Sequence, residues 1–291
     1  MTNKHIKKTD AELIFTRDCV YKIFTTDIVT KEVIEDLFRL DKLANRRPLF
    51  LEKTDVQHSP FSESHIVGNP PVIVMRLVDD INALSTLAKH SKLDVSRMES
   101  LANTLYSFHD RTKFLMTDNP TYFADRLDKD LSLVADIAQK DTSIARVYQK
   151  LIEIAEKHRG AINSRTKISP VVEGHGDLNL DHIYLEGHDF CFIDFSHKKK
   201  YRLDDPSRDL AGVVLHLLEL KNGNLVQPFI DSYKSHREDE NFDLMLKLQL
   251  GKKFLVKYFI YYGGFAPEHR EDDQIELCLN SADSVLRFIS N

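Results

Sequence analysis

The first 48 residues change from a strand-like to a helix-like pattern of apolar positions. Residues 11–25 hold apolar side chains on both sides of a polar break at 16–18, which predicts a hairpin of two strands. A helical repeat of apolar residues follows, at Val33, Leu37, Leu40 and Ala44. Thr30 suits the N-cap of this helix, and Pro48 limits its extension.

The rest of the chain divides into a short strand-like part and two long helical parts. Strands are predicted at 50–56 and 66–77, because both segments are apolar and a turn-rich stretch separates them. Residues 81–160 are helical in period, and residues 168–195 return to short strand-like runs. Helical patterns dominate again from residue 209 to the end. This order predicts an α+β protein rather than a repeat or a pure bundle.

The length supports two lobes. A chain of 291 residues can bury a sizeable core, and 42% apolar with 29% charged residues excludes a disordered chain. Because the pattern changes after Asp79-Asp80, we expect a small β-rich lobe at residues 1–78 and a larger, mostly helical lobe at 79–291.

Charge and cysteine content narrow the function classes. The net charge of −5 argues against a dedicated nucleic-acid-binding protein, which would carry a basic excess. The three cysteines are far apart and form no CxxC pair, so we expect a reducing, cytoplasmic location. No apolar stretch is long enough for a membrane span, and the polar first ten residues lack the apolar segment of a signal peptide. We therefore expect no nucleic-acid or membrane partner.

Two aspartates in residues 174–211 are the candidates for chemistry. Asp177 follows Gly-His-Gly in a predicted turn, where a carboxylate could accept the proton of an attacking hydroxyl. Asp194 ends the apolar run 190–193, and a carboxylate at a strand end can hold a hard cation. One acid for the nucleophile and one for the metal are what phosphoryl transfer needs.

Three motifs in this segment resemble one known family. HGDL at residues 175–178, IDF at 193–195 and DPSRDLA at 205–211 are similar to the signature of the aminoglycoside phosphotransferase and choline kinase-like family. The three motifs occur in the family's order and at its usual spacings, which is far more specific than a lone HGD. GHGDLxxxHIYL, at 174–185, resembles an uncharacterised branch of that family. The resemblance implies a bilobal protein-kinase-like fold and a small-molecule kinase.

The resemblance also implies residue roles. Asp177 would be the catalytic base, Asn179 would lie near the phosphates, and Asp194 would hold Mg²⁺ bridging the phosphates of ATP, with GTP as the alternative. His175 and Asp209 would support the loop rather than touch substrate.

One position departs from the family pattern. The family usually has Asn five residues after the catalytic Asp, as the second metal ligand, whereas this chain has His182. Imidazole suits softer metals than Mg²⁺. His182 could therefore bind metal with Mn²⁺ favoured, Asp181 or a water could replace it, or the second metal site could be lost.

The small lobe offers a candidate nucleotide-binding lysine. Lys22, in the strand-like Val-Tyr-Lys-Ile run, looks like the family's phosphate-binding lysine, which needs a carboxylate from the following helix. On a helical wheel Asp36 borders the apolar stripe and is the preferred partner, with Glu32 second. An ordinary exposed strand lysine is the alternative. No glycine-rich loop precedes Lys22, because the predicted hairpin tip is Thr16-Arg17-Asp18.

The sequence thus predicts a phosphotransferase that moves the γ-phosphoryl group of ATP, or of GTP, to a hydroxyl of a small molecule. Because of His182 and the missing glycines, the alternative is a nucleotide-binding pseudokinase with weak or no activity and a regulatory role. A kinase acting on proteins is a third option. No motif after residue 225 indicates which acceptor is used.

Overall fold

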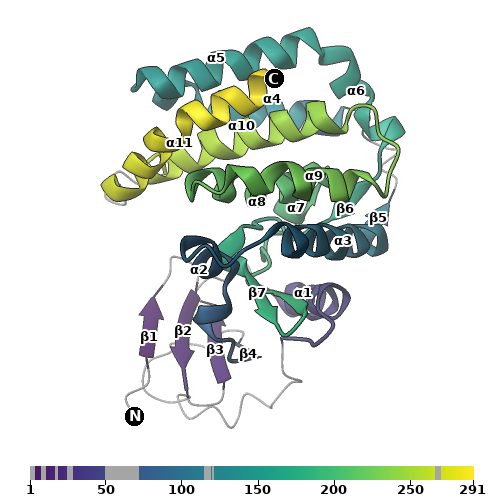
Figure 1. The fold of residues 1–291 in the computed structure, drawn as a ribbon, viewed down its shortest axis with the longest axis vertical. Helices are drawn as coiled ribbons and strands as arrows, with labels where there is room; N and C mark the ends of the chain where they lie inside the picture. Colours follow the sequence, from purple (N-terminus) through teal and green to yellow (C-terminus); the bar gives the residue numbers. More distant parts are fainter. Residues whose placement is uncertain are drawn as a thin grey trace. The chain divides into compact units, whose positions relative to one another are not determined.

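A computed structural model describes most of the chain (Figure 1). The described residues are 4–7, 11–16, 19–24, 29–49, 72–114, 119, 121–265 and 270–291. They fall into two compact units: Met1–Thr86 with Asp181–Lys199, and Leu87–Leu180 with Lys200–Asn291. The predicted division into lobes at 78/79 stays a prediction.

The first unit contains a four-stranded antiparallel sheet in the order β1-β2-β3-β4 (Figure 1). The strands are β1 Lys4–Lys7, β2 Ala11–Phe15, β3 Cys19–Phe24 and β4 Val72–Arg76. The predicted hairpin is confirmed as β2 and β3, although positions 17 and 18 of its tip lie outside the described residues. The strand predicted at 50–56 and the first part of 66–77 also lie outside them. Lys22 is paired on both sides, opposite Leu13 and Ile73.

One helix and one hairpin complete the first unit. Helix α1, Lys31–Ala44, buries Leu37, Leu40 and Ala44 of the predicted stripe, as its helical period requires. Thr30 occupies the N-cap position but makes no side-chain cap hydrogen bond. The hairpin of β7 Ile183–Glu186 and β8 Asp189–Phe192 confirms the predicted strand runs, and α1 packs against β8. The 3-10 turn η2 covers Asp80–Asn82.

The second unit is mostly helical, as the pattern predicts. Helix α10 lies at its centre and packs against α4, α5, α8 and α11 (Figure 1). The long helices of this unit are α3 Val95–Thr112, α4 Tyr122–Ala138, α5 Thr142–Lys157, α6 Arg159–Ile168, α8 Ser207–Glu219, α9 Val226–Lys234, α10 Phe242–Tyr261 and α11 Asp272–Ser290. The short turn η4 covers Gly223–Leu225. No described helix is both long and apolar enough to cross a bilayer.

Two strands of a small antiparallel sheet lead directly into the sequence motifs, β6 into HGDL and β9 into DPSRDLA. The strand order of this sheet is β5-β6-β9. Its strands are β5 Lys113–Phe114, β6 Val171–Glu173 and β9 Leu203–Asp204. The HGD loop, defined here as residues 174–180, leaves β6 and enters the turn η3 Leu180–His182. Three short elements span the boundary between the units: α2 Leu84–Lys89, η3 and α7 Lys199–Arg202.

Candidate active site

The HGD loop is held by the first turn of α8. The carboxylate of Asp209 accepts hydrogen bonds from the backbone N–H groups of His175 (2.7 Å) and Gly176 (3.1 Å). Gly174 makes room for this carboxylate, because a Cβ there would lie 2.4 Å from Asp209 Oδ2. His175 and Asp209 are both buried. These contacts agree with the supporting roles expected for His175 and Asp209.

Buried hydrogen-bond partners keep Asp209 ionised. Its Oδ2 lies 3.2 Å from His109 Nε2, and His109 Nδ1 lies 2.8 Å from the Tyr233 hydroxyl. Burial alone would favour the neutral acid, but the hydrogen bond and charge of His109 and the His175 N–H outweigh it. The pKa of Asp209 is therefore held well below its usual range. The loop rests on a fixed negative charge rather than on a neutral carboxyl group.

Two further contacts fix the rest of the loop. Gly212 of α8 lets the Leu178 carbonyl approach closely, since a Cβ at Gly212 would lie 1.9 Å from that oxygen. The Leu178 carbonyl also accepts a hydrogen bond from Lys253 Nζ of α10, at 3.1 Å. One helical turn further along α8, His216 Nδ1 accepts from the Leu180 N–H at 3.2 Å. Asp209, Gly212 and His216 share one face of α8 and together receive the loop.

The predicted base lies at the exposed side of this loop. The Asp177 side chain is 62% exposed, and its Oδ1 lies 3.6 Å from Lys253 Nζ. The Asp177 N–H donates to His175 Nδ1 at 3.3 Å, and Asn179 Nδ2 contacts the Asp177 carbonyl at 3.4 Å. A carboxylate on a fixed backbone with an open side is what a general base needs.

The predicted metal ligand lies in the first unit, just after β8. Asp194 has a φ of 60°, a left-handed conformation that aspartate tolerates better than most residues. Its Oδ1 forms an ion pair with Lys22 Nζ, and its Oδ2 lies 3.9 Å from His182 Nε2. Lys22 also lies over the Phe24 ring, 5.3 Å from its centroid. Three of the predicted site residues are thus brought together: Lys22, His182 and Asp194.

The end of α1 holds the strand that leads to Asp194. The Asn45 side-chain amide donates to the Phe192 carbonyl (2.9 Å) and accepts from the Phe192 N–H (2.6 Å). Asp41 fixes this amide by accepting from its Nδ2 at 2.6 Å. The Ile193 N–H donates to the His182 carbonyl at 2.9 Å, which ties the turn carrying His182 to the chain before Asp194.

Asp36 lies on the half-buried side of α1. Its carboxylate is 3.3 Å from the Arg39 guanidinium and 3.8 Å from Lys199 Nζ. Glu32 is exposed in the first turn of the same helix. The pairing of Lys22 with Asp36, or with Glu32 as second choice, stays a prediction, and the ion pair of Lys22 with Asp194 is an addition to it.

Asp194 and its neighbour His182 fit a magnesium or manganese ion whose remaining ligands would be oxygens of phosphate and water. Among the described residues, no group of three or more His, Cys, Asp and Glu side chains is arranged to hold a metal by itself. Mg²⁺ is usually held by one or two carboxylates together with substrate phosphates and water, so one carboxylate is sufficient. His182, at 3.9 Å from Asp194, adds a nitrogen donor that Mn²⁺ accepts more readily.

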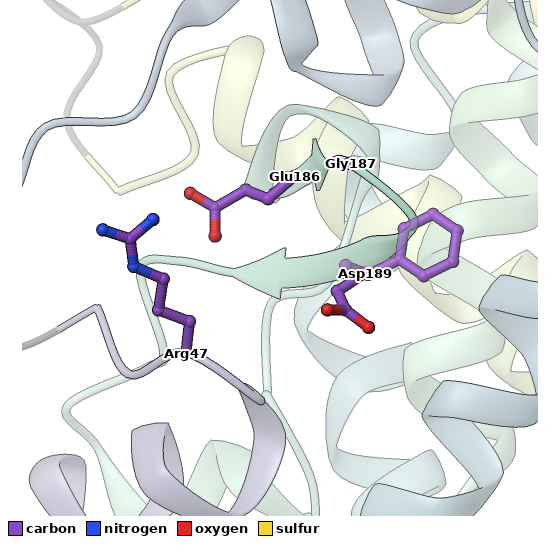
Figure 2. Close-up of a pocket in the computed structure, with 5 residues that line it drawn as sticks. Arg47, Glu186, Gly187 and Asp189 are labelled. Atoms are coloured by element: carbon purple, nitrogen blue, oxygen red, sulfur yellow. The ribbon is translucent and has the colours of Figure 1, made fainter.

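A separate cavity of about 420 Å³ lies at the β7–β8 turn (Figure 2). It is lined by Arg47, Glu186, Gly187, Asp189 and Phe190. Its two carboxylates have basic partners, since Glu186 pairs with Arg76 (2.7 Å) and Asp189 with Arg46 (3.1 Å). None of the predicted site residues lines this cavity, so it is distinct from the side chains described above.

Comparison with known proteins places the fold. No protein-family model matches the sequence, and no curated protein matches it. Solved structures do match. A choline/ethanolamine kinase family protein from Mesorhizobium loti has a TM-score of 0.62 at 12% identity, over 99% of this chain and 92% of that chain. An aminoglycoside phosphotransferase from Alicyclobacillus acidocaldarius has a TM-score of 0.58 at 14% identity, over 99% of this chain and 90% of that chain.

A glucosamine kinase, bound to glucosamine, ADP and inorganic phosphate, has a TM-score of 0.60 at 12% identity, over 97% of this chain and 75% of that chain. The fold is protein-kinase-like, as in choline kinases and aminoglycoside phosphotransferases. The α+β class and the kinase-like fold expected from the three motifs are confirmed.

Several residues that build this part of the kinase-like fold were missed in the sequence. Lys253 and His216 lie in helical segments without a motif, and only tertiary packing brings them to the HGD loop. Gly212 carried a usable signal, because an isolated glycine inside a helical pattern costs stability relative to alanine and therefore suggests a packing reason. Asn45 ends a predicted helix, where its role could not be told from that of an ordinary cap.

Proposed function

We propose that the protein is a small-molecule phosphotransferase that moves the γ-phosphoryl group of ATP, or of GTP, to a hydroxyl of its acceptor. The observation that carries this proposal is the exposed Asp177 carboxylate on a loop whose backbone is fixed by Asp209, Gly212 and Lys253. The fold adds support, because the solved structures that share it include enzymes that phosphorylate small molecules.

In the proposed reaction Asp177 acts on the acceptor and leaves the phosphates to other groups. The acceptor oxygen forms a bond to the γ-phosphorus while the bond from that phosphorus to the β–γ bridging oxygen breaks. ADP leaves with the electrons of the broken bond, and Asp177 takes the proton of the acceptor hydroxyl. Asn179, two residues after Asp177, would lie near the phosphates. Positioning and charge neutralisation supply most of the rate.

The other predicted residues would serve the nucleotide. Lys22 would bind the α- and β-phosphates, with Asp36 or Glu32 orienting it, and Asp194 would hold the divalent ion with His182 as a second donor. A bound Mg²⁺ or Mn²⁺ neutralises phosphate charge and orients the transferred group. The contact between Lys22 and Asp194 supports this assignment, because the lysine already lies beside the carboxylate that would hold the metal. Two of the solved structures that share the fold contain ADP.

A nucleotide-consumption screen tests the proposal. ADP or GDP release is measured across hydroxylated metabolites and antibiotics, with Mg²⁺ or Mn²⁺, for the wild type and for Asp177→Asn as matched blank. We expect at least one compound to raise release in the wild type only, since the amide cannot accept the proton. Acceptor-dependent release that is undiminished in Asp177→Asn would contradict the role of Asp177.

The second candidate function is a nucleotide-binding pseudokinase with a regulatory role. His182, in the place of the expected second oxygen ligand and 3.9 Å from Asp194, favours this alternative. Thermal-shift titration with ATP separates the two functions, because ligand binding stabilises the native state by mass action. Stabilisation that needs the divalent ion, together with nucleotide turnover, supports the enzyme. Stabilisation without metal dependence and without turnover supports the pseudokinase.

A further inference from the structure

Helix α10 carries three lysines that are mostly enclosed, and their surroundings differ. Lys257 Nζ lies 2.6 and 2.7 Å from the two oxygens of Glu219, whose side chain is fully buried. Lys252 Nζ lies 3.4 Å from Asp130 and 3.9 Å from the buried Asp204. Both ammonium groups thus have carboxylate partners from helices or strands of the core.

Lys253 has a different pair of partners. Its Nζ donates to the Leu178 carbonyl at 3.1 Å and lies 3.6 Å from Asp177 Oδ1. The Lys253 side chain is only 20% exposed, whereas the Asp177 carboxylate is 62% exposed. An enclosed ammonium group costs free energy unless a carboxylate compensates it, and a solvated carboxylate compensates it weakly. The carboxylate partners of Lys252 and Lys257 therefore compensate for enclosure of the ammonium group better than the exposed Asp177 carboxylate does for Lys253.

The chain also makes room for this lysine. A Cβ at Gly212 would lie 2.6 Å from Lys253 Nζ and 1.9 Å from the Leu178 carbonyl oxygen. The same glycine thus admits both the loop carbonyl and the ammonium group that binds it. One cation joins the loop backbone to the carboxylate that the loop presents.

We propose that Lys253 is a positioning residue for Asp177, in that it fixes the Leu178 carbonyl and orients the Asp177 carboxylate for the acceptor hydroxyl. This inference rests on the proposed function, in which Asp177 takes the acceptor proton. Lys253 acts through Asp177 and contributes no ligand to the metal. Misplacing a catalytic group by about 1 Å can lower the rate about a hundredfold, so such a residue has a large effect without touching substrate.

The orientation of Asp177 by Lys253 should depend on pH, because it requires the charged ammonium group. The groups that face it are Asp177 of the HGD loop and Arg208 and Asp209 of α8. Burial, with Arg208, lowers the pKa of Lys253, although Asp177 and Asp209 act in the opposite direction. The ammonium group therefore loses its proton at a lower pH than a free lysine, and orientation of Asp177 should fail as pH rises through that pKa. An arginine keeps its charge over the whole range.

The test compares Lys253→Met, Lys253→Arg and Lys247→Met, the last as a control from the same helix. ADP release from ATP with Mn²⁺ is measured from neutral to alkaline pH, using the acceptor found in the screen or water alone. We expect Lys253→Met to lower kcat about a hundredfold with KM for ATP unchanged. Lys253→Arg should retain most of the activity and hold it to a higher pH than the wild type. Lys247→Met should behave as the wild type.

Two results overturn the inference, and they are distinguishable. If the wild type turns over and Lys253→Met matches Lys247→Met, Lys253 does not position Asp177, although the proposed function stands. If the wild type shows neither metal-dependent stabilisation by ATP nor ADP release, the proposed function fails and the inference fails with it. Unfolding midpoints of all variants, compared by circular dichroism, check that the loss in Lys253→Met is not a loss of fold.

Discussion

The HGD loop and the surroundings of Asp194 are held in different ways. In the second unit, side chains of α8 and α10 bind the backbone of the loop, so the backbone that carries Asp177 is fixed. In the first unit, the Asp194 carboxylate itself is the bound group, with Lys22 on one oxygen and His182 near the other. Binding of a ligand need not break the contacts to the loop backbone. At Asp194, by contrast, a metal ion would replace contacts of the carboxylate itself.

This comparison predicts that the two regions respond differently to mutation. Substitutions in the support of the HGD loop should lower stability and displace the loop, since the Asp209 carboxylate there is buried and already hydrogen-bonded. The surroundings of Asp194 should tolerate substitution structurally and change in their preference for metal and nucleotide. Three predictions test this difference, in order of decreasing effect.

The largest effect is expected for loss of the buried ion pairs of Arg165, which lie near the start of α8. Arg165 is fully buried and pairs with Asp205 (2.7 Å) and Asp239 (2.6 Å), and Asp205 in turn accepts from the N–H of Ser207, the first residue of α8. Arg165→Met should cost about 3–5 kcal/mol of unfolding free energy, because it leaves the buried Asp205 carboxylate without a cationic partner and Asp239 with Arg237 alone. Urea unfolding measures the loss.

The control for this prediction is Arg146→Met. Arg146 pairs with Asp283 at 3.4 Å, but both side chains are more than half exposed. Its loss should change the unfolding free energy by less than about 1 kcal/mol. Equal effects of Arg165→Met and Arg146→Met would contradict the account of the buried support.

The next effect concerns the close approach at Gly212. Gly212→Ala would put a Cβ 1.9 Å from the Leu178 carbonyl, so the HGD loop must move. We expect about a hundredfold lower turnover, and a loss of about 1–3 kcal/mol in stability. Gly160→Ala in α6 is the matched control, since a Cβ there meets nothing within 4 Å. Turnover in Gly212→Ala equal to that in Gly160→Ala would show that the loop does not depend on this approach.

The smallest effect concerns metal choice. His182→Asn restores the oxygen donor that the family pattern has at this position, and Mg²⁺ prefers oxygen to imidazole nitrogen. We expect the ratio of Mg²⁺-supported to Mn²⁺-supported turnover to rise about tenfold, with little change in the unfolding midpoint. An unchanged ratio would indicate that His182 does not contribute to the metal site.

The sequence predicted the fold well where local pattern and motif spacing decide structure. The hairpin of β2 and β3, the helix α1 with its buried stripe, and the strand runs around Asp177 and Asp194 follow from residue periodicity. The kinase-like fold came from three short motifs rather than from any long-range pattern. The supporting function of Asp209 could be expected from DPSRDLA, although its partner His109 could not.

The rest of the site could not be predicted, because it depends on contacts between helices distant in sequence. Lys253 is 76 positions after Asp177 and belongs to a helix in which Lys252 and Lys257 lie close to it. Only the tertiary packing of α8 and α10 distinguishes it from Lys252 and Lys257. The ion pair of Lys22 with Asp194 likewise joins two segments of the first unit that are far apart in sequence, and the helical pattern pointed only to the carboxylates of α1.

The central claim is that Asp177 serves the acceptor and Asp194 serves the metal-bound nucleotide. Thermal-shift titration with ATP, with and without Mn²⁺, combined with ADP release, compares the wild type, Asp177→Asn and Asp194→Asn. The account predicts metal-dependent stabilisation in the wild type and Asp177→Asn, near 2.7 kcal/mol at about 100 times Kd, and its loss in Asp194→Asn. It also predicts turnover in the wild type alone. Metal-dependent stabilisation and turnover of wild-type size in Asp194→Asn would contradict it.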